Sequence, residues 1–262
     1  MNAEHYQFIT FDLDRGVLTL RLNRPEAMNA INAGLHEELS RVFAEIAGNR
    51  AVHAVVLTGE GRGFCAGGDL AWFRDIDQRG LDQLFREARK IIIDMLELPQ
   101  PIIAAVNGHA AGLGATLALF CDMIYVAESA KLADPHVRIG VAAGDGGSAI
   151  WPLLVGPARA KQYLFTGDSL SASEAERIGL VNQVVADSET LTVATAMARR
   201  LADGPRLAIQ ASKASVNKIL RDTVNLVLDT SLALEKENFF SADHKEAIKA
   251  FEEKRPPVYR GV

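Results

Sequence analysis

The chain has 262 residues, of which 48% are hydrophobic and 23% are charged, so one main core can form without a stapling metal or disulfide. Its two cysteines, Cys65 and Cys121, form neither a CxxC pair nor a Cys/His cluster with zinc spacing. Because the net charge is −5 and no basic run occurs, the composition argues against a nucleic-acid or anionic-membrane surface. Small-molecule chemistry is the better expectation.

The start of the chain predicts a cytoplasmic protein. Glu4, Asp12 and Asp14 precede any apolar stretch, whereas a signal peptide has a basic start and a hydrophobic centre. Residues 101–121 contain no acidic residue, lysine or arginine and are long enough to span a membrane. Their prolines, polar residues and three glycines instead predict a strand, a turn and a helix buried in protein, so no membrane partner is expected.

The first half of the chain predicts alternating strands and helices. Leucines at 18, 20 and 22 alternate with polar residues, which is the period of a half-buried strand. Apolar residues from Met28 to Ile46 recur at helical spacing, a second helical segment follows the glycine-rich stretch 59–68 and ends near Leu98, and another opens at Gly112. Buried strands are expected at 54–58, 102–106 and 123–127. This order predicts an α/β fold with a largely buried sheet.

The second half is predicted to be mostly helical. Ser171 to Glu174 has the sequence of a capping box, and Gly179 is placed to end that helix. A strand is expected at 181–185, and helices are expected at 191–202, 205–220, 223–239 and 242–254. We therefore expect an α/β core over residues 1–200 and a helical C-terminal oligomerisation region over 201–262.

Four ordered stretches carry a family resemblance. They are residues 23–30 (NRPEAMNA), 64–70 (FCAGGDL), 104–114 (AAVNGHAAGLG), and Gly167-Asp168 followed by 172–179. Together they resemble the crotonase, or enoyl-CoA hydratase/isomerase, superfamily, and the resemblance runs from about residue 8 to Arg260. It implies a ClpP/crotonase-like fold of repeated ββα units with a helical C-terminal extension, assembled as a homotrimer or a dimer of trimers.

The resemblance also implies an acyl-CoA-processing enzyme of the kind found in fatty acid metabolism. Its substrate would be a coenzyme A thioester, with no permanently bound cofactor and no metal. The backbone N–H groups of Gly68 and Leu113 would form an oxyanion hole, which stabilises the charge that develops on the thioester oxygen. Leu113 stands where many relatives carry glycine, but the donor is its backbone, so the hydrogen bond remains possible. The implied coenzyme A site comprises Arg24, Ala66, Gly67, Gly68, Asp69, Leu70, Phe251 and Lys254, of which Arg24 and Lys254 also fit plain surface charges.

The sequence departs from the family at its two catalytic glutamates, which match Thr116 and His136 here. A threonine hydroxyl does not transfer protons near neutral pH, so hydration by two carboxylates is not expected. His136, preceded by Asp134, and Asp145 nine residues later offer a base and an acid, or Asp145 offers a nucleophile. A hydrogen-bonded loop histidine and a turn-forming aspartate are the ordinary interpretations of the same residues.

Three other functions stay open on the sequence. The spacing of His136 and Asp145 also resembles a β-diketone hydrolase branch, which cleaves carbon–carbon bonds without coenzyme A, although the Ala66 to Asp69 loop favours a CoA substrate. Loss of both glutamates also fits a catalytically inactive protein that binds CoA esters. A nicotinamide-dependent oxidoreductase is a weaker alternative, because the glycines at 144 and 146 are followed by prolines that interrupt the expected unit.

The sequence does not identify the acyl group. Residues expected to line its pocket are Trp72, Phe73, Leu113 and Trp151. The remaining histidines are expected to be solvated or packed, and Glu235 and Glu237 are expected on a helix surface.

Overall fold

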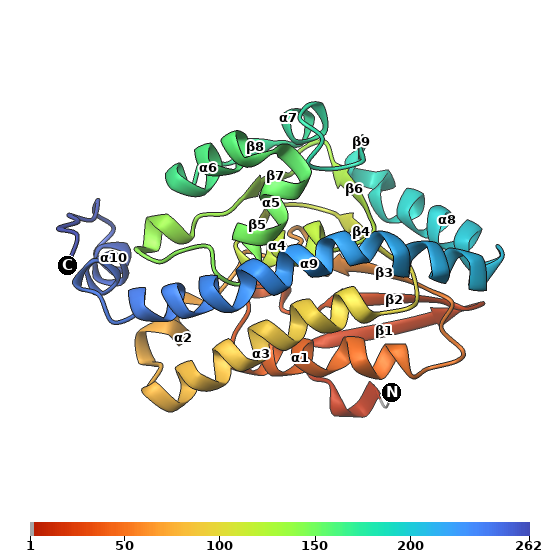
Figure 1. Cartoon of the computed structure of the whole chain (residues 1–262), viewed down its shortest axis with the longest axis horizontal. Coiled ribbons are helices and arrows are strands. Elements are labelled where there is room, and N and C mark those ends of the chain that lie inside the picture. The colour runs from red at the N-terminus through yellow and green to blue at the C-terminus, as the bar shows by residue number, and fades with distance from the viewer. Residues whose placement is uncertain (1–2) are drawn as a thin grey trace.

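A six-stranded sheet forms the centre of the computed structural model, which describes residues 3–262 (Figure 1). Its strands, in spatial order, are β1 (Ile9–Asp14), β2 (Val17–Leu22), β3 (Ala54–Gly59), β4 (Ile102–Val106), β6 (Met123–Ala127) and β9 (Gln183–Val185). β1 pairs antiparallel with β2, and every later pair is parallel. β3 and β4 are buried along their whole length, because helices cover both faces of a parallel sheet.

A second, three-stranded sheet contains β5 (Ala110–Ala111), β7 (Lys131–Ala133) and β8 (Leu170–Ser171). β4 is followed by β5 and by α4 (Leu113–Leu119), and β6 is followed by β7 and then by α5 (Gly147–Val155). This repetition matches the expected ββα units. It also places the start of α4 at the junction between the two sheets.

Helices cover the two faces of the large sheet through different side chains. On one face α8 (Thr190–Ala202) packs through Ala194, Ala198 and Ala202, whose small side chains let the helix approach β3 and β4 closely. The alternate residues of the strands face the larger core cluster, which contains α1 (Ala33–Ala47) and α3 (Gln78–Glu97). α9 (Arg206–Asn238) lies across α3 and α5, as Figure 1 shows.

The remaining helical elements lie between these strands and helices or at the ends of the chain. They are η1 (Ala3–His5), η2 (Pro25–Ala27), α2 (Leu70–Asp75), η3 (His136–Ile139), α6 (Pro157–Thr166), α7 (Ala172–Arg177), η4 (Asp187–Glu189) and α10 (Ala242–Glu252). The predicted start of α7 is confirmed, because the Ser171 side chain accepts a hydrogen bond from the Glu174 N–H at 3.2 Å.

Two helix predictions in the first half of the chain were wrong. The first helix begins at Ala33, where Asn32 caps it, and Met28 and Asn29 adopt left-handed backbone conformations instead. The segment after Gly68 forms two helices rather than one, because Asp69 and Asp77 each cap a helix start. These aspartates satisfy backbone N–H groups that a continuous helix would have bonded internally.

The C-terminal region also differs from the prediction. Residues 206–238 form the single 33-residue helix α9, because Arg221 and Asp222 at the expected break are ordinary helix residues. The last strand of the large sheet is shorter than expected, and β1 was not predicted. Among the helices of residues 3–262, none combines the length and the apolar character needed to cross a bilayer. The division at residue 200 falls in the last turns of α8 and stays a prediction.

Glu38 of α1 provides a test of how the N-terminal segment is held. Its buried carboxylate accepts hydrogen bonds from the Gln7 N–H at 2.6 Å and the Phe8 N–H at 3.0 Å. We expect Glu38→Ala to lower the free energy of unfolding by about 3 kcal/mol, because two partly buried N–H groups lose a charged acceptor. Urea unfolding measures this. Glu37→Ala, at the neighbouring exposed residue, is the control, and its unfolding free energy is expected to change by no more than about 0.5 kcal/mol. Equal effects of the two variants would show that Glu38 does not hold the N-terminal segment.

Candidate functional site

Two glycine-containing segments meet beside the small sheet. A parallel bridge joins Cys65 to Ala110, and the Ala111 N–H donates to the Cys65 carbonyl at 2.9 Å. This close approach depends on glycine. A Cβ on Gly67, whose φ is +88°, would lie 2.8 Å from the Ala111 carbonyl oxygen, and a Cβ on Gly68 would lie 2.2 Å from Phe73 Cζ.

The meeting of these segments leaves two backbone donors unused. The N–H groups of Gly68 and Leu113 donate to no other group within residues 3–262, whereas the neighbouring Asp69 N–H donates to the Ile31 carbonyl at 3.0 Å. Leu113 is the first residue of α4, so its N–H has no acceptor inside the helix. Gly68 and Leu113 line the same small cavity, and the two predicted donors are therefore brought together.

Two adjoining cavities make up the candidate site. The inner cavity, of about 30 Å³, is lined by Ile31, His36, Gly68, Trp72, Phe73, Leu84, Ala88, Leu113, His136, Asp145, Glu235 and Phe239. The outer cavity, of about 320 Å³, shares Gly68, Phe73 and His136 with it. A ligand too large for the inner cavity can therefore occupy both at once, with Gly68 at the boundary.

A histidine surrounded by three carboxyl groups forms one wall of the inner cavity. Asp134, at the end of β7, contacts Nδ1 of His136. On the other side of the ring, Nε2 lies 3.3 Å from Asp145 Oδ2 and 3.9 Å from Glu235 Oε1. All three carboxyl groups are buried, so they act on the ring through a medium of low dielectric constant.

Thr116 holds Asp145 in place. Its hydroxyl, on α4, donates to Asp145 Oδ1 at 3.2 Å, and both side chains are buried. Thr116 is one of the two positions at which the family resemblance implied a catalytic glutamate. Its hydroxyl instead supports a carboxylate that a different segment of the chain provides.

The charges of this cluster follow from burial and from mutual attraction. Burial lowers the pKa of His136, but the carboxylates of Asp145 and Asp134 outweigh burial and raise this pKa well above its ordinary value of 6.5. Burial raises the pKa of Asp145, but the imidazolium and the Thr116 hydroxyl lower it further than burial raises it. The pair is therefore charged at neutral pH.

Glu235 has the opposite character. Burial raises its pKa well above 4.5, and the neighbouring imidazolium only partly offsets this effect. Its Oε2 has no hydrogen-bond partner within the described residues. Glu235 thus presents a neutral carboxylic acid next to the charged pair.

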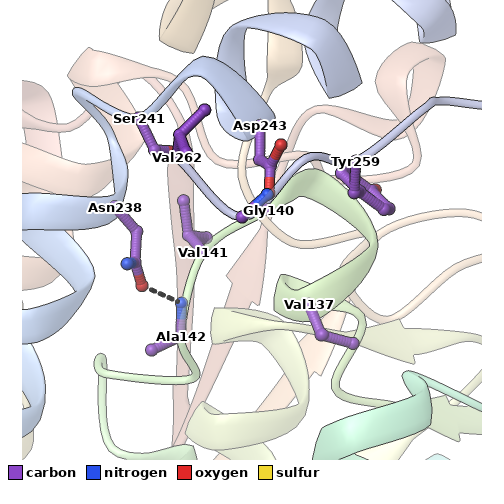
Figure 2. Close-up of a pocket in the computed structure, with 10 residues that line it drawn as sticks. Val137, Gly140, Val141, Ala142, Asn238, Ser241, Asp243, Tyr259 and Val262 are labelled. Atoms are coloured by element: carbon purple, nitrogen blue, oxygen red, sulfur yellow. Dashed lines mark hydrogen bonds between the residues drawn. The ribbon is translucent and has the colours of Figure 1, made fainter.

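One face of α9 holds the loop that carries Asp145. Ser231 Oγ donates to the Gly144 carbonyl at 2.9 Å, and Asn238 Oδ1 accepts from the Ala142 N–H at 3.0 Å, a bond drawn in Figure 2. Together with Glu235 these residues follow a spacing of four and three, which places them on one side of a helix. The same helix therefore positions the Asp145 loop and contributes Glu235.

The prediction that Glu235 lies on a helix surface was wrong, since the residue is only 4% exposed. A signal for its burial was present in the sequence. Val224, Leu228 and Ser231 precede it at intervals of four, three and four, and they form a buried stripe that Glu235 continues. Glu237 is exposed, as expected.

A separate hollow of about 590 Å³ lies between η3, the start of α10 and the last residues of the chain. Figure 2 shows Val137, Val141, Tyr259 and Val262 along its walls. Asp243 is the only acidic or basic side chain in its lining, and its carboxylate already accepts from the Arg260 and Gly261 N–H groups at 2.7 and 2.9 Å. This hollow therefore offers no free catalytic group.

Five of the eight residues predicted to bind coenzyme A lie around one cavity. Ala66, Gly67, Gly68, Leu70 and Phe251 line the outer cavity, which Arg138 and Arg255 also line without having been predicted. Both arginines are ion-paired, Arg138 with Asp168 and Arg255 with Glu246 and Glu253.

The other three predicted residues do not line this cavity. Arg24 binds the Ala30 carbonyl and lies 3.2 Å from Asp69, and Asp69 caps α2. Lys254 is exposed beyond the end of α10. Arg24 and Asp69 therefore stabilise the loop of residues 66–70 without lining the outer cavity.

Other sequence candidates are now placed. Trp72, Phe73 and Leu113 line the inner cavity, but Trp151 is fully buried against Tyr163 and does not. The glycines at 144 and 146 follow η3 rather than a strand, so the nicotinamide-binding interpretation was wrong.

Within residues 3–262, no group of three His, Cys, Asp or Glu side chains is arranged to hold a metal ion.

Comparisons with known proteins agree with this architecture. The sequence profile described as Enoyl-CoA hydratase/isomerase matches residues 12–262. The chain is 35% identical to the 1,2-epoxyphenylacetyl-CoA isomerase of Escherichia coli K12 over 260 residues, which cover 97% of this chain and 99% of that protein. It is 35% identical to the crotonyl-CoA hydratase of Syntrophomonas wolfei over 255 residues, which cover 95% and 96%.

A solved structure is similar as well. The crystal structure of an enoyl-CoA hydratase/isomerase from Mycobacterium paratuberculosis superposes with a TM-score of 0.90 and 35% identity, covering 92% of this chain and 97% of that one. The expected crotonase fold is thereby confirmed.

The neutral state of Glu235 predicts a pH dependence of stability. A carboxyl group whose pKa is raised by folding contributes stability below its unfolded pKa of about 4.5, and this contribution is lost as the pH rises through the folded pKa. We expect Glu235→Gln to make the decline of unfolding free energy above pH 4.5 less steep, because the amide stays neutral. Chemical unfolding at a series of pH values measures the slope. Glu237→Gln on the exposed side of α9 is the control, and identical slopes for both variants and the native protein would contradict the assignment.

Proposed function

The chain belongs to the enoyl-CoA hydratase/isomerase family, and from that membership we propose that it binds an acyl-CoA thioester and moves a proton at the carbon next to the thioester carbonyl. One observation carries the proposal. The two unused N–H groups, of Gly68 and Leu113, share a cavity with the charged pair of His136 and Asp145.

The two N–H groups would bind the thioester oxygen. Negative charge grows on this oxygen when a proton leaves the adjacent carbon or when a nucleophile adds to a conjugated double bond. Donors that are fixed in advance stabilise that charge more than they stabilise the uncharged substrate, and each contributes on the order of 3 kcal/mol. The enolate is therefore the species to which this site is complementary.

The charges of the pair assign the proton-transfer roles. The lowered pKa of Asp145 leaves it ionised, so it has an unprotonated oxygen to accept the proton, and the raised pKa of His136 leaves its ring protonated, so it has a proton to donate. In isomerisation Asp145 takes a proton from one carbon and returns it to another. In hydration Asp145 takes the proton of the water that adds, the electron pair of the double bond moves to the thioester oxygen as the enolate, and His136 protonates the carbon next to the carbonyl.

The outer cavity would hold the coenzyme A part of the substrate. Ala66 and Gly67 offer backbone groups along it, and Phe251 offers apolar surface. Arg138 and Arg255 also line it, and each would have to share its guanidinium between its carboxylate partners and a coenzyme A phosphate. Coenzyme A enters as part of the thioester, and the proposed reaction uses no other cofactor.

Carbon–carbon bond hydrolysis is a second candidate because His136 lies between two carboxyl groups. Such a histidine can position a water that attacks a ketone carbonyl of a β-diketone or a β-keto acyl-CoA, after which the carbon–carbon bond breaks and its electron pair forms an enolate. The product is then one water heavier and is split in two, which mass spectrometry separates from hydration. A protein that binds CoA esters but converts none is the remaining alternative.

We also propose that the protein assembles through its helical C-terminal region as a homotrimer or a dimer of trimers in the cytoplasm. Val216, Ile219, Leu226 and Leu234 of α9 are exposed apolar residues at intervals of three, seven and eight, so they follow one side of the helix. Burial of this stripe against a second copy would remove apolar surface from water. Both cysteines are free and buried, which fits a reducing compartment.

Asp145→Asn tests the proton acceptor. The amide keeps the size and the hydrogen bond to Thr116 but has no useful basicity, so we expect kcat to fall about 10²–10⁴-fold while the affinity for a saturated acyl-CoA changes little. Turnover of a panel of enoyl-CoA esters with mass spectrometry of the products measures the first quantity, and calorimetry measures the second. Asp229→Asn on the exposed side of α9 is the control. Unchanged turnover in Asp145→Asn would remove this residue from the mechanism.

Leu113→Pro tests the oxyanion hole. Leu113 is the first residue of α4, a position at which proline is tolerated, so the substitution removes the N–H with little cost to the helix. We expect kcat to fall about 10²–10³-fold. Leu113→Met keeps the N–H and a side chain of similar volume, and it is expected to lose far less. Folding of both variants is checked by circular dichroism. An active, folded Leu113→Pro enzyme would show that the donor is not needed.

A further inference from the structure

A second histidine lines the inner cavity without lining the outer cavity that would hold coenzyme A. His36, on α1, is only 2% exposed, and it lines the inner cavity together with Gly68 and Leu113. Its Nδ1 lies 2.6 Å from Glu87 Oε2 on α3. Its Nε2 makes no hydrogen bond to any group within residues 3–262.

Glu87 fixes which nitrogen of His36 is free. Burial raises the pKa of this carboxyl, but hydrogen bonds from His36 and Gln83 lower the pKa further than burial raises it, so Glu87 is ionised. Gln83 Nε2 donates to Glu87 Oε1 at 2.7 Å. An ionised carboxylate with its other oxygen held in this way accepts the Nδ1–H of His36, and the ring is locked with Nε2 unpaired.

The remaining surroundings of His36 are apolar. Trp72 packs on its ring at 5.6 Å between centroids, and Ile31, Leu84, Ala88 and Phe239 complete this part of the lining. Apart from His136, Asp145 and Glu235, His36 is the only ionisable side chain in the lining of the inner cavity. Because Nε2 has no protein partner there, a ligand group that bonds to it in place of a water molecule is recognised at this position.

We propose, on the basis of the proposed function, that His36 is a specificity-determining residue that selects acyl groups bearing a hydroxyl or oxo oxygen beyond the reacting carbons. A thioester oxygen on Gly68 and Leu113, with coenzyme A in the outer cavity, directs the acyl group into the inner cavity that His36 lines. Neutral Nε2 accepts a hydrogen bond from a hydroxyl, and charged Nε2–H donates one to an oxo group. The substrate class is therefore an oxygenated acyl-CoA thioester.

The size of the inner cavity supports a compact group. Its volume of about 30 Å³ holds roughly one water molecule, so a long hydrocarbon chain does not fit without movement of Trp72 or Phe73. A short or cyclic acyl group that ends in an oxygen needs less room. The oxygen then replaces the water that the free nitrogen would otherwise bind.

Binding of matched pairs of saturated CoA thioesters tests the proposal. The two members of a pair share one carbon skeleton, straight or cyclic, and differ by a hydroxyl or oxo group placed at each carbon beyond the β position in turn. Saturated esters bind without reacting, so calorimetry gives Kd alone. We expect at least one oxygenated ester to bind the native protein about tenfold more tightly than its hydrocarbon partner. A preference for the oxo ester requires an N–H donor at Nε2, because an oxo oxygen only accepts, whereas a hydroxyl can donate to Nε2 or accept from it.

Two variants separate recognition from a structural role. His36→Phe keeps a planar ring of similar size but has no polar nitrogen, and we expect it to remove the preference while hydrocarbon esters bind as before. His36→Gln keeps a hydrogen-bonding group and is expected to retain part of the preference. If His36 only ties α1 to α3, His36→Phe changes both members of a pair equally, and this result overturns the proposal.

The affinities of the native protein alone also test the proposal. If every pair binds with equal affinity, the specificity assignment fails while the proposed function stands, because CoA esters still bind. If no CoA ester binds, the proposed function fails and the specificity assignment fails with it. Neither of these results depends on the folding of a variant.

Discussion

The attraction between the His136 imidazolium and the Asp145 carboxylate is the interaction on which the rest of the site depends. Both groups are buried, and each shifts the pKa of the other toward the charged form. Their 3.3 Å separation keeps a charged acid and a charged base side by side in a small cavity at neutral pH. Burial, and then repulsion from Asp145 and Asp134, raises the pKa of the neighbouring Glu235 and so favours its neutral form.

Such a pair needs support from several parts of the chain. Asp134 holds one nitrogen of the ring, Thr116 holds one oxygen of Asp145, and α9 holds the loop between them through Ser231 and Asn238. Each support comes from a different element, so the charges cannot separate without unpacking the core. The helical C-terminal region thus forms part of the wall of the candidate site, in addition to its proposed role in assembly.

Under the proposed function, this arrangement stands in place of the two glutamates that the family resemblance implied. His136 occupies one of those two positions, and Asp145, in the loop before α5, lies beside the other, Thr116. Thr116 cannot transfer a proton itself, but its hydroxyl donates a hydrogen bond to Asp145, the carboxylate proposed to do so. His36 lines the same cavity from α1, so in the two proposals proton transfer and selectivity depend on different residues.

The sequence by itself determined the α/β fold, the two glycine-containing turns and the pairing of His136 with Asp145, because each depends on short-range patterns or on motifs that stand in order along the chain. It also predicted the cap at Ser171, since a cap is a contact between residues three positions apart. It did not place the start of α1, where Asn32 rather than the apolar periodicity sets the boundary.

Only the tertiary structure decided that Glu235 is buried beside His136 and that His36 faces the same cavity, because these contacts join residues about one hundred positions apart. It also decided that Arg24 supports the loop at Asp69 instead of lining the outer cavity. Helical periodicity shows which residues share a face, but not what that face meets. Which residues such a face contacts depends on how α1, α3 and α9 pack around the inner cavity.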